Sequence, residues 1–89
     1  MSEVHLVVTD PSGLHARPAA RFVQAASRFT SRIVIRQDGR EADAKSLIAI
    51  LGLTVRPSSQ ITLAAEGPDA DAAITVLEAE LAPYVSHVG

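Results

Sequence analysis

His15 is the residue whose type and neighbours could carry out chemistry. It follows the turn-forming run at residues 10–13, and Pro18 fits the first turn of a helix, where a missing N–H costs nothing. His15 is therefore expected at a helix N-terminus, where the unpaired N–H groups of Ala16 and Arg17 and the helix dipole favour an anion. A neutral imidazole in this position could act as a nucleophile and carry a phosphoryl group.

Arg17 would supply the counter-charge, because its guanidinium fork suits phosphate oxygens. An exposed histidine beside an arginine is, however, common and usually has no function. His5 and His87 serve as internal comparisons, since neither stands next to a cation at a helix start. The three histidines also lack the short spacing of a metal site, so no metal is expected.

Other phosphoryl and hydrolytic chemistries lack their sequence patterns. No Gly-rich loop ends in Gly-Lys-Ser or Gly-Lys-Thr, and no carboxylate cluster suits magnesium. A helix start explains Asp69 and Asp71, and a solvated face explains Glu78 and Glu80, better than paired-carboxylate hydrolysis does. We therefore expect no cofactor, and another protein must phosphorylate His15.

Length and composition place this chemistry in one small soluble domain, 1–89. A chain of 89 residues buries only roughly 60 to 65% of its unfolded surface and cannot support two cores. The absence of cysteine excludes disulfides and zinc-thiolate sites, as in a reducing cytosol. Because no apolar run could cross a bilayer and the N-terminus does not resemble a signal peptide, we expect a cytoplasmic protein without membrane insertion.

The charge is small but unevenly distributed. All eight cationic residues lie between Arg17 and Arg56, although the net charge is only −2. This basic section could attract an acidic partner or a phosphate. Nucleic-acid binding is not expected, because the whole chain is slightly acidic and its three aromatic residues are too scattered to form a stacking platform.

Apolar runs and alternation predict the strands. The runs lie at 4–8, 32–36 and 60–66, and Asp38-Gly39 suits a tight hairpin into a short polar edge strand at 40–43. The strand at 60–66 is expected to place alternate apolar side chains on one buried face.

Helical spacing of apolar residues predicts three helices. A short one at 47–51 would be capped by Ser46 and ended by Gly52, and the last would start at Asp69 and end before Pro83. The element order predicts an α+β sandwich, with helices on one face of a mainly antiparallel sheet. The polar stripe of the first helix comprises Arg17, Arg21, Gln24 and Arg28.

The run Gly13-Leu14-His15-Ala16-Arg17-Pro18-Ala19 resembles the active-site motif of HPr, the histidine phosphocarrier of the bacterial phosphoenolpyruvate-dependent sugar phosphotransferase system. The similarity extends over essentially the whole chain, through Lys45-Ser46-Leu47, Ile61-Thr62-Leu63 and Glu66-Gly67. The resemblance implies the order βαββαβα and a four-stranded antiparallel sheet, strand order 1-4-2-3, covered on one face by three helices.

The resemblance also assigns roles at the first helix. His15 would accept a phosphoryl group on Nδ1 from enzyme I, which takes it from phosphoenolpyruvate, and would transfer it to an enzyme IIA domain. Arg17 and the N–H groups of Ala16 and Arg17 would stabilise the phosphoryl charge. Such a protein is a phosphoryl-transfer component without independent turnover.

A docking surface is implied on the short second helix. Leu47, Ile48 and Leu51 resemble the apolar patch that family members present to both partners, although this segment is too apolar for every residue to face solvent. We expect Leu47 and Ile48 to contact partners. Arg21 or Arg28 would steer acidic partners, or would simply form a solvated face.

Ser46 matches a serine that some bacteria phosphorylate with a dedicated kinase/phosphorylase to regulate carbon use, with a transcriptional regulator as a further partner. A helix N-cap explains this serine equally well. Both roles are compatible, since a phosphate is favourable at a helix start while its charge could impede docking.

The sequence departs from the family pattern after Ser46. Family members often have a Leu-Gly pair about two residues beyond Leu51-Gly52, and commonly have Gly where this chain has Pro57-Ser58-Ser59. We expect a shorter second helix and a longer loop, which bears on the docking patch and leaves His15 untouched.

Several functional hypotheses stay open. A sugar, nitrogen-regulatory or dihydroxyacetone-related phosphotransferase branch would use the same histidine motif, and only the partners distinguish them. A non-catalytic interaction or regulatory module would keep the fold, and His15 would then have no chemical role. A small α+β RNA binder would show salt-sensitive RNA binding, which the charge and aromatic content argue against. A monomer is expected, although the sequence itself does not reveal the oligomeric state.

Overall fold

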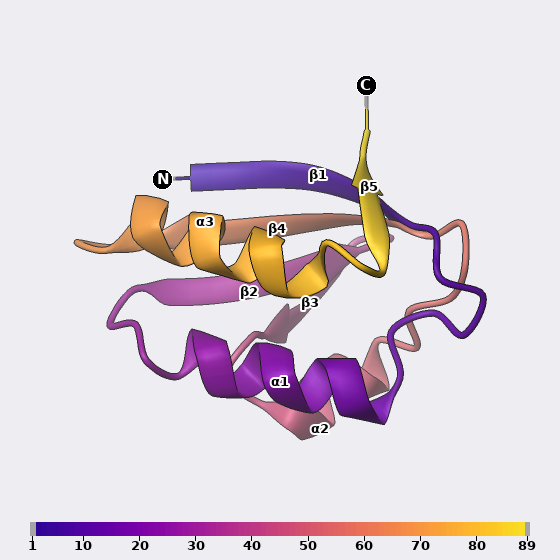
Figure 1. Ribbon diagram of the computed structural model, residues 1–89. Helices are drawn as coiled ribbons and strands as arrows, with labels where there is room; N and C mark the ends of the chain where they lie inside the picture. Colours follow the sequence, from indigo (N-terminus) through magenta and orange to yellow (C-terminus); the bar gives the residue numbers. More distant parts are fainter. Residues whose placement is uncertain (1, 89) are drawn as a thin grey trace.

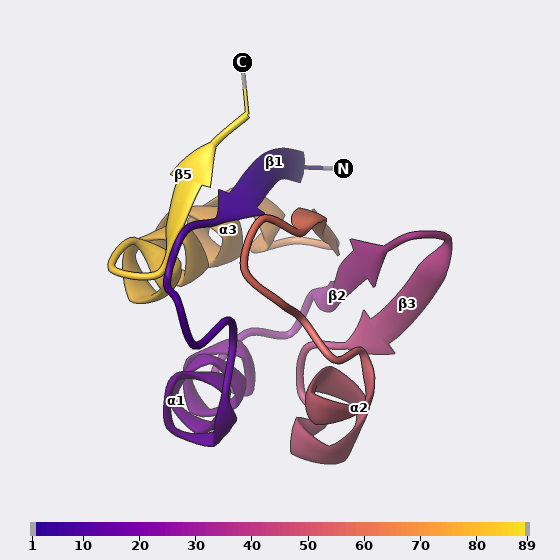
Figure 2. The same cartoon turned by 90° about the vertical axis from the view of Figure 1, so that its right-hand side faces the viewer.

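The computed structural model describes residues 2–88, which form a β-sheet and three helices in two layers (Figure 1). All three helices lie on the same side of the sheet (Figure 2). The α+β sandwich predicted from the sequence is confirmed. Along the chain the elements are β1 (Ser2–Val8), α1 (Ala16–Ala26), β2 (Arg32–Gln37), β3 (Arg40–Asp43), α2 (Leu47–Gly52), β4 (Gln60–Glu66), α3 (Ala70–Leu81) and β5 (Val85–His87).

The sheet is antiparallel throughout and has the strand order β3-β2-β4-β1-β5. The expected neighbours 1-4-2-3 are present, but the expected total of four strands is wrong, because β5 pairs with the outer edge of β1. Leu6 lies opposite His87, and Val8 lies opposite Val85. This strand was missed because three residues are too few to produce a recognisable alternation.

The core lies between the sheet and the helices. Alternate residues of β4 and one stripe of α3 are buried as predicted, and Phe22 of α1 is fully buried. Burying an aliphatic or aromatic side chain contributes about 1.5–3 kcal/mol, so this shared core fixes α1 and its N-terminus on the sheet. The largest fully buried side chains of the sheet are Leu6, Val8, Ile33, Ile35 and Leu63.

Helix α1 ends earlier than its polar stripe suggested. Its last residue is Ala26, and the hydroxyl of Ser27 donates a hydrogen bond to the Val23 carbonyl oxygen at 2.8 Å. The prediction that Arg28 belongs to the helical stripe is therefore wrong. A serine hydroxyl that bonds a carbonyl four residues back competes with the helical hydrogen bonds, which favours an end at this point.

Helix α2 also ends differently from the prediction. Ser46 is its N-cap, as expected, but Gly52 is simply its last helical residue. The left-handed backbone that ends the helix lies at Thr54, whose φ is 54° and whose N–H donates to the Leu51 carbonyl oxygen at 3.2 Å. A β-branched residue is unfavourable in this region, since its side chain crowds the backbone.

We expect Thr54→Gly to stabilise the protein. A non-glycine residue in the left-handed region destabilises the folded state by about 1–2 kcal/mol, and glycine removes this strain. Glycine also has more conformational freedom in the unfolded chain, which lowers the unfolding free energy by about 0.5–1 kcal/mol. The net gain in unfolding free energy should be about 0.5–1 kcal/mol. Urea denaturation measures it, with Thr75→Gly as the matched control.

Thr75 is an exposed residue within α3, so glycine there should lower the unfolding free energy by about 0.5–1 kcal/mol. If Thr54→Gly and Thr75→Gly lowered the unfolding free energy equally, the Thr54 backbone would not be strained.

Asp69 links two loops rather than capping its own helix. Its carboxylate accepts hydrogen bonds from the N–H groups of Thr30 and Ser31, each at 2.9 Å, and from both of their hydroxyls. These bonds, the one from the Ser31 hydroxyl first, lower the pKa of Asp69 to about 2. The sequence had assigned Asp69 only to a helix start.

The lowered pKa of Asp69 predicts an acid-dependent stability. The ionised carboxylate stabilises the fold above its ordinary pKa of 3.8, and this contribution is lost as the pH falls towards about 2. Asp69→Asn should therefore be less stable than wild type at neutral pH, and the difference should shrink on acidification.

Urea denaturation at a series of pH values checks the Asp69 prediction. Glu80→Gln, at an exposed position of α3, is the control and should track the wild type at every pH. A difference between Asp69→Asn and wild type that stays constant down to the lowest pH would contradict the assigned role.

Candidate functional site

His15 lies at the N-cap of α1, where the sequence placed it. Its backbone is extended (φ −93°, ψ −173°), and its carbonyl oxygen accepts the first helical bond from Ala19 N–H at 3.0 Å. The side chain is exposed and makes no capping bond. Within residues 2–88 neither ring nitrogen has a hydrogen-bond partner, so both are free to react.

The first turn of α1 has two backbone donors directly after His15. Ala16 and Arg17 are the first two helical residues, and Pro18, the third, has no N–H. No acceptor among residues 2–88 bonds the N–H of Ala16 or Arg17. Free amides and the positive end of the helix dipole therefore lie at the helix start that His15 precedes.

The arginines predicted for this site are placed unequally. Arg17 and Arg21 are exposed and lie one turn apart on α1, with Arg17 two residues from His15. Arg28 is exposed beyond the other end of the 11-residue helix, about 16 Å along its axis. Arg17, but not Arg28, therefore lies at the same end of α1 as His15.

A tight crossing of two loops positions His15. The Asp10 carboxylate accepts from Ser12 N–H at 2.8 Å, and the Asp10 carbonyl oxygen accepts from Gly13 N–H at 2.9 Å. Leu14 is buried, and its N–H donates to the Val55 carbonyl oxygen at 3.2 Å. The motif preceding His15 is thus bound to the loop that follows α2.

Gly13 is necessary at this crossing. Its φ is +66°, and a Cβ there would lie 2.4 Å from the Val55 carbonyl oxygen. The sequence identified Gly13 only as part of a turn and of the family motif, because the approach of residue 55 depends on tertiary structure.

Helix α2 packs beside α1 (Figure 2) and carries the expected apolar residues. Ile48 is 85% exposed and Leu51 is 41% exposed. Leu47 is half-buried against the core. The Ser46 hydroxyl accepts from Ala49 N–H at 3.2 Å, so Ser46 caps the helix and is only partly accessible.

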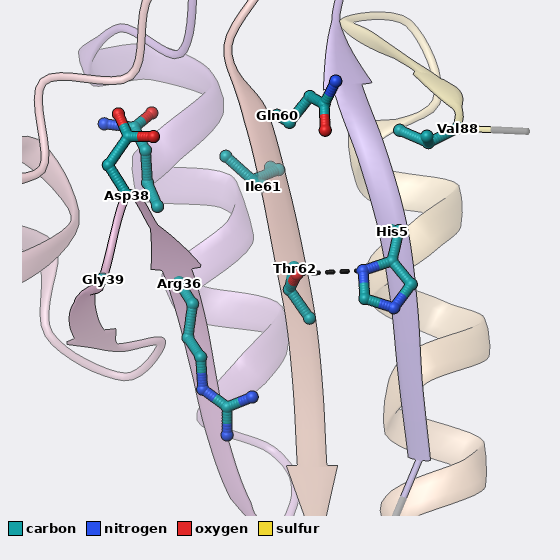
Figure 3. Close-up of a pocket in the computed structure, with 9 residues that line it drawn as sticks. His5, Arg36, Asp38, Gly39, Gln60, Ile61, Thr62 and Val88 are labelled. Atoms are coloured by element: carbon teal, nitrogen blue, oxygen red, sulfur yellow. Dashed lines mark hydrogen bonds between the residues drawn. The ribbon is translucent and has the colours of Figure 1, made fainter.

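A separate polar hollow of about 300 Å³ lies on the sheet face away from the helices (Figure 3). Its lining includes His5 and Thr62, whose Nδ1 and Oγ1 atoms are 3.0 Å apart, together with Val88. None of the predicted site residues lines this hollow.

The cation that lines this hollow is already paired. Arg36 contacts Glu41 at 3.0 Å and Glu3 at 3.3 Å. The hydrogen bond with Glu41 raises the pKa of Arg36, and the same bond lowers the pKa of Glu41. The Arg36 guanidinium is therefore not free to hold a ligand.

Within residues 2–88, no helix has the length and apolar character that crossing a membrane requires. In the same part of the chain, no three His, Asp or Glu side chains gather closely enough to hold a metal ion.

The PTS-HPr family model, which describes the PTS HPr component phosphorylation site, matches residues 2–82. The chain belongs to the PTS HPr family. This confirms the resemblance inferred from the residues around His15.

Individual HPr family members agree with this assignment. The HPr-like protein Crh of Halalkalibacterium halodurans is 46% identical over 77 residues, which cover 86% of this chain and 92% of that protein. Phosphocarrier protein HPr of Lysinibacillus sphaericus is 40% identical over 77 residues, 86% and 88% of the two chains. The solved structure of a Mycoplasma histidine-containing phosphocarrier protein has a TM-score of 0.90 and 32% identity, covering 92% of this chain and 93% of that one.

Proposed function

We propose that this HPr family member is a cytoplasmic phosphocarrier. His15 accepts a phosphoryl group from phospho-enzyme I and transfers it to enzyme IIA domains in sugar uptake. The observation that supports this proposal best is the exposed His15 side chain at the N-terminus of α1, followed by two residues whose backbone N–H groups have no acceptor within residues 2–88. A phosphoryl group on that ring lies where the helix dipole favours negative charge.

The proposed chemistry uses His15 first as a nucleophile and then as a leaving group. On acceptance, a ring nitrogen attacks phosphorus, a P–N bond forms, and the bond to the donor breaks. On transfer, the acceptor attacks the same phosphorus and the P–N bond breaks. The Arg17 guanidinium and the Ala16 and Arg17 amides offset the phosphoryl charge in both directions.

Partner docking is proposed on the adjoining faces of α1 and α2. The exposed side chains of Ile48 and Leu51 offer apolar contacts, and half-buried Leu47 borders them. Arg21, exposed one turn from Arg17, supplies charge for acidic partners. Arg28 adds a positive charge at the far end of α1, so it acts only with partners that cover the whole helix.

Regulation at Ser46 is the second part of the proposal. It is supported by the similarity to Crh of Bacillus subtilis, a catabolite repression HPr with 39% sequence identity. A kinase/phosphorylase would modify the Ser46 hydroxyl, and a transcriptional regulator would recognise the modified form. Phosphate there would lie at the start of α2, next to the exposed Ile48. Its negative charge would oppose docking of acidic partners.

Labelling with radioactive phosphoenolpyruvate tests the proposed function. With enzyme I, the protein should acquire a phosphate that is labile in acid and stable in alkali, as a phosphohistidine is, and it should stay unlabelled without enzyme I. Adding enzyme IIA domains of the sugar, nitrogen-regulatory and dihydroxyacetone branches in turn should discharge the label to one branch. Absence of an acid-labile label would overturn the phosphocarrier assignment.

A further inference from the structure

Arg56 begins a tight turn after α2 that the sequence did not identify. The Arg56 carbonyl oxygen accepts from Ser59 N–H at 3.1 Å, and Arg56 N–H donates to the Ser59 hydroxyl at 3.2 Å. Pro57 occupies the second position, and Ser58, the third, has a φ of 70°. This is the pattern of a type II turn, with serine where glycine is preferred.

The turn is fixed on both sides to the loop that leads to His15. At one end, Val8 N–H donates to the Ser59 carbonyl oxygen at 2.9 Å, and Ser58 N–H donates to the Val8 carbonyl oxygen at 2.8 Å. At the other end, the Val55 carbonyl oxygen holds Leu14 N–H. The backbone of Arg56 is therefore held against the His15 loop at a fixed place.

The resulting approach to His15 is close. A Cβ built on Gly13 would lie 3.2 Å from the Arg56 Cα atom. Gly13 and His15 are separated by one residue, so their Cα atoms are at most about 7.6 Å apart. A long arginine side chain starting at this point can reach a group on the His15 ring.

The Arg56 guanidinium is available for such a contact. Its side chain is exposed, and no hydrogen bond or ion pair holds the guanidinium within residues 2–88. It borders a polar hollow of about 350 Å³ that Asp38 and Arg40 also line, with no ion pair to Asp38. By contrast, Arg40 donates to the Gly52 carbonyl oxygen at 3.0 Å.

Backbone strain marks the segment that carries Arg56. Thr54 and Ser58, two residues before and after it, both have positive φ without being glycine. Such conformations cost about 1–3 kcal/mol each and persist where the surrounding structure requires them, often at functional sites.

We propose that Arg56 is a second phosphate-binding residue of the phosphohistidine site. Its guanidinium approaches the phosphoryl oxygens from the α2–β4 loop, while Arg17 approaches from α1. Two guanidinium groups offset the negative charge of the phosphoryl group better than one, so the phosphohistidine is stabilised. The inference rests on the proposed function of His15 and adds a residue to that site.

The first test does not require enzyme I. In a protein whose His5 and His87 are replaced by glutamine, potassium phosphoramidate phosphorylates His15; the ring nitrogen bonds to phosphorus and ammonia leaves. The ³¹P chemical shift of the product then reports on its surroundings. Arg56→Gln should shift this resonance, Arg56→Lys should shift it less, and Arg32→Gln, at an exposed position of β2, should leave it unchanged.

The second test measures how the phosphoryl group partitions between phospho-enzyme I and this protein with limiting phosphoenolpyruvate. Arg56→Gln should move the equilibrium towards phospho-enzyme I by about fivefold, as expected for one partly exposed charge pair. Arg56→Lys should restore part of this change, and Arg32→Gln, at an exposed position of β2, should match wild type. Equal urea midpoints would exclude unfolding as the cause.

The outcomes separate the Arg56 inference from the proposed function. If Arg56→Gln leaves both the ³¹P shift and the partition as in wild type, while Arg17→Gln changes them, the Arg56 assignment is overturned. If enzyme I fails to phosphorylate the wild type, but the ³¹P shift still responds to Arg56→Gln, the phosphocarrier role fails and the Arg56 contact stands.

Discussion

Replacing His15 with alanine is expected to abolish phosphoryl acceptance while leaving the fold intact. The ring is the proposed nucleophile, and the methyl group of alanine cannot form a P–N bond. The His15 side chain is exposed and makes no capping bond, so its loss should change the unfolding free energy by no more than about 0.5 kcal/mol. Labelling with enzyme I and phosphoenolpyruvate measures the first effect, and urea denaturation measures the second.

The other two histidines provide matched controls for His15→Ala. His5 contacts Thr62 on the sheet, and His87 contacts Glu78 at 2.5 Å near the C-terminus. Neither lies at a helix N-terminus, so His5→Ala and His87→Ala should be labelled as fully as wild type. An acid-labile label on His15→Ala would show that a residue other than His15 accepts the phosphoryl group.

Gly13→Ala is expected to produce the largest loss of stability near the site. Its φ of +66° is unfavourable for alanine, and the new Cβ would meet the Val55 carbonyl oxygen at 2.4 Å. The neighbouring atom belongs to the backbone, so one of the two loops must move and the Leu14–Val55 hydrogen bond must weaken. Strain and displacement together should lower the unfolding free energy by roughly 2–5 kcal/mol, and His15 should be labelled more slowly.

Gly39→Ala separates the two causes of the Gly13 effect. Gly39 has a φ of +77°, but no atom lies within 4 Å of its Cβ position. Gly39→Ala should lower the unfolding free energy only through the strain of a positive φ, by about 1–2 kcal/mol, and should leave labelling of His15 unchanged. Similar losses for Gly13→Ala and Gly39→Ala in urea denaturation would mean that the loop crossing at Val55 contributes nothing.

The regular elements could be predicted because their residues repeat at the period of the element. The alternation in β4 and the helical stripe of α3 predicted the buried faces correctly. Such patterns are local, and burial on one face enforces them. The short β5 and the early end of α1 at Ser27 involve too few residues to carry a period, and both were missed.

The candidate site could be predicted only in part, because its residues come from two distant segments. Pro18 and the residues around His15 predicted the helix N-terminus, because the preference for proline in the first helical turn is a local property of the sequence. The approach of Val55 and Arg56 to Gly13 depends on the packing of α2 beside α1, which no local pattern specifies.

The departure from the family pattern after Ser46 has a structural counterpart. Thr54 lies two residues beyond Gly52, and Ser58 lies within Pro57-Ser58-Ser59; both have positive φ. The two stretches in which this departure was expected therefore each contain a non-glycine residue with a left-handed backbone. The monomeric state expected from the sequence stays a prediction.

Amide chemical shifts in ¹⁵N-labelled protein, recorded before and after phosphorylation of His15, test the central claim most directly. If the phosphoryl group lies at the N-terminus of α1, the amide protons of Ala16 and Arg17 should become its donors and show the largest downfield shifts. If the amide chemical shifts of Ala16 and Arg17 do not change, or if the largest changes occur away from α1, the helix start does not hold the phosphoryl group and the account is contradicted.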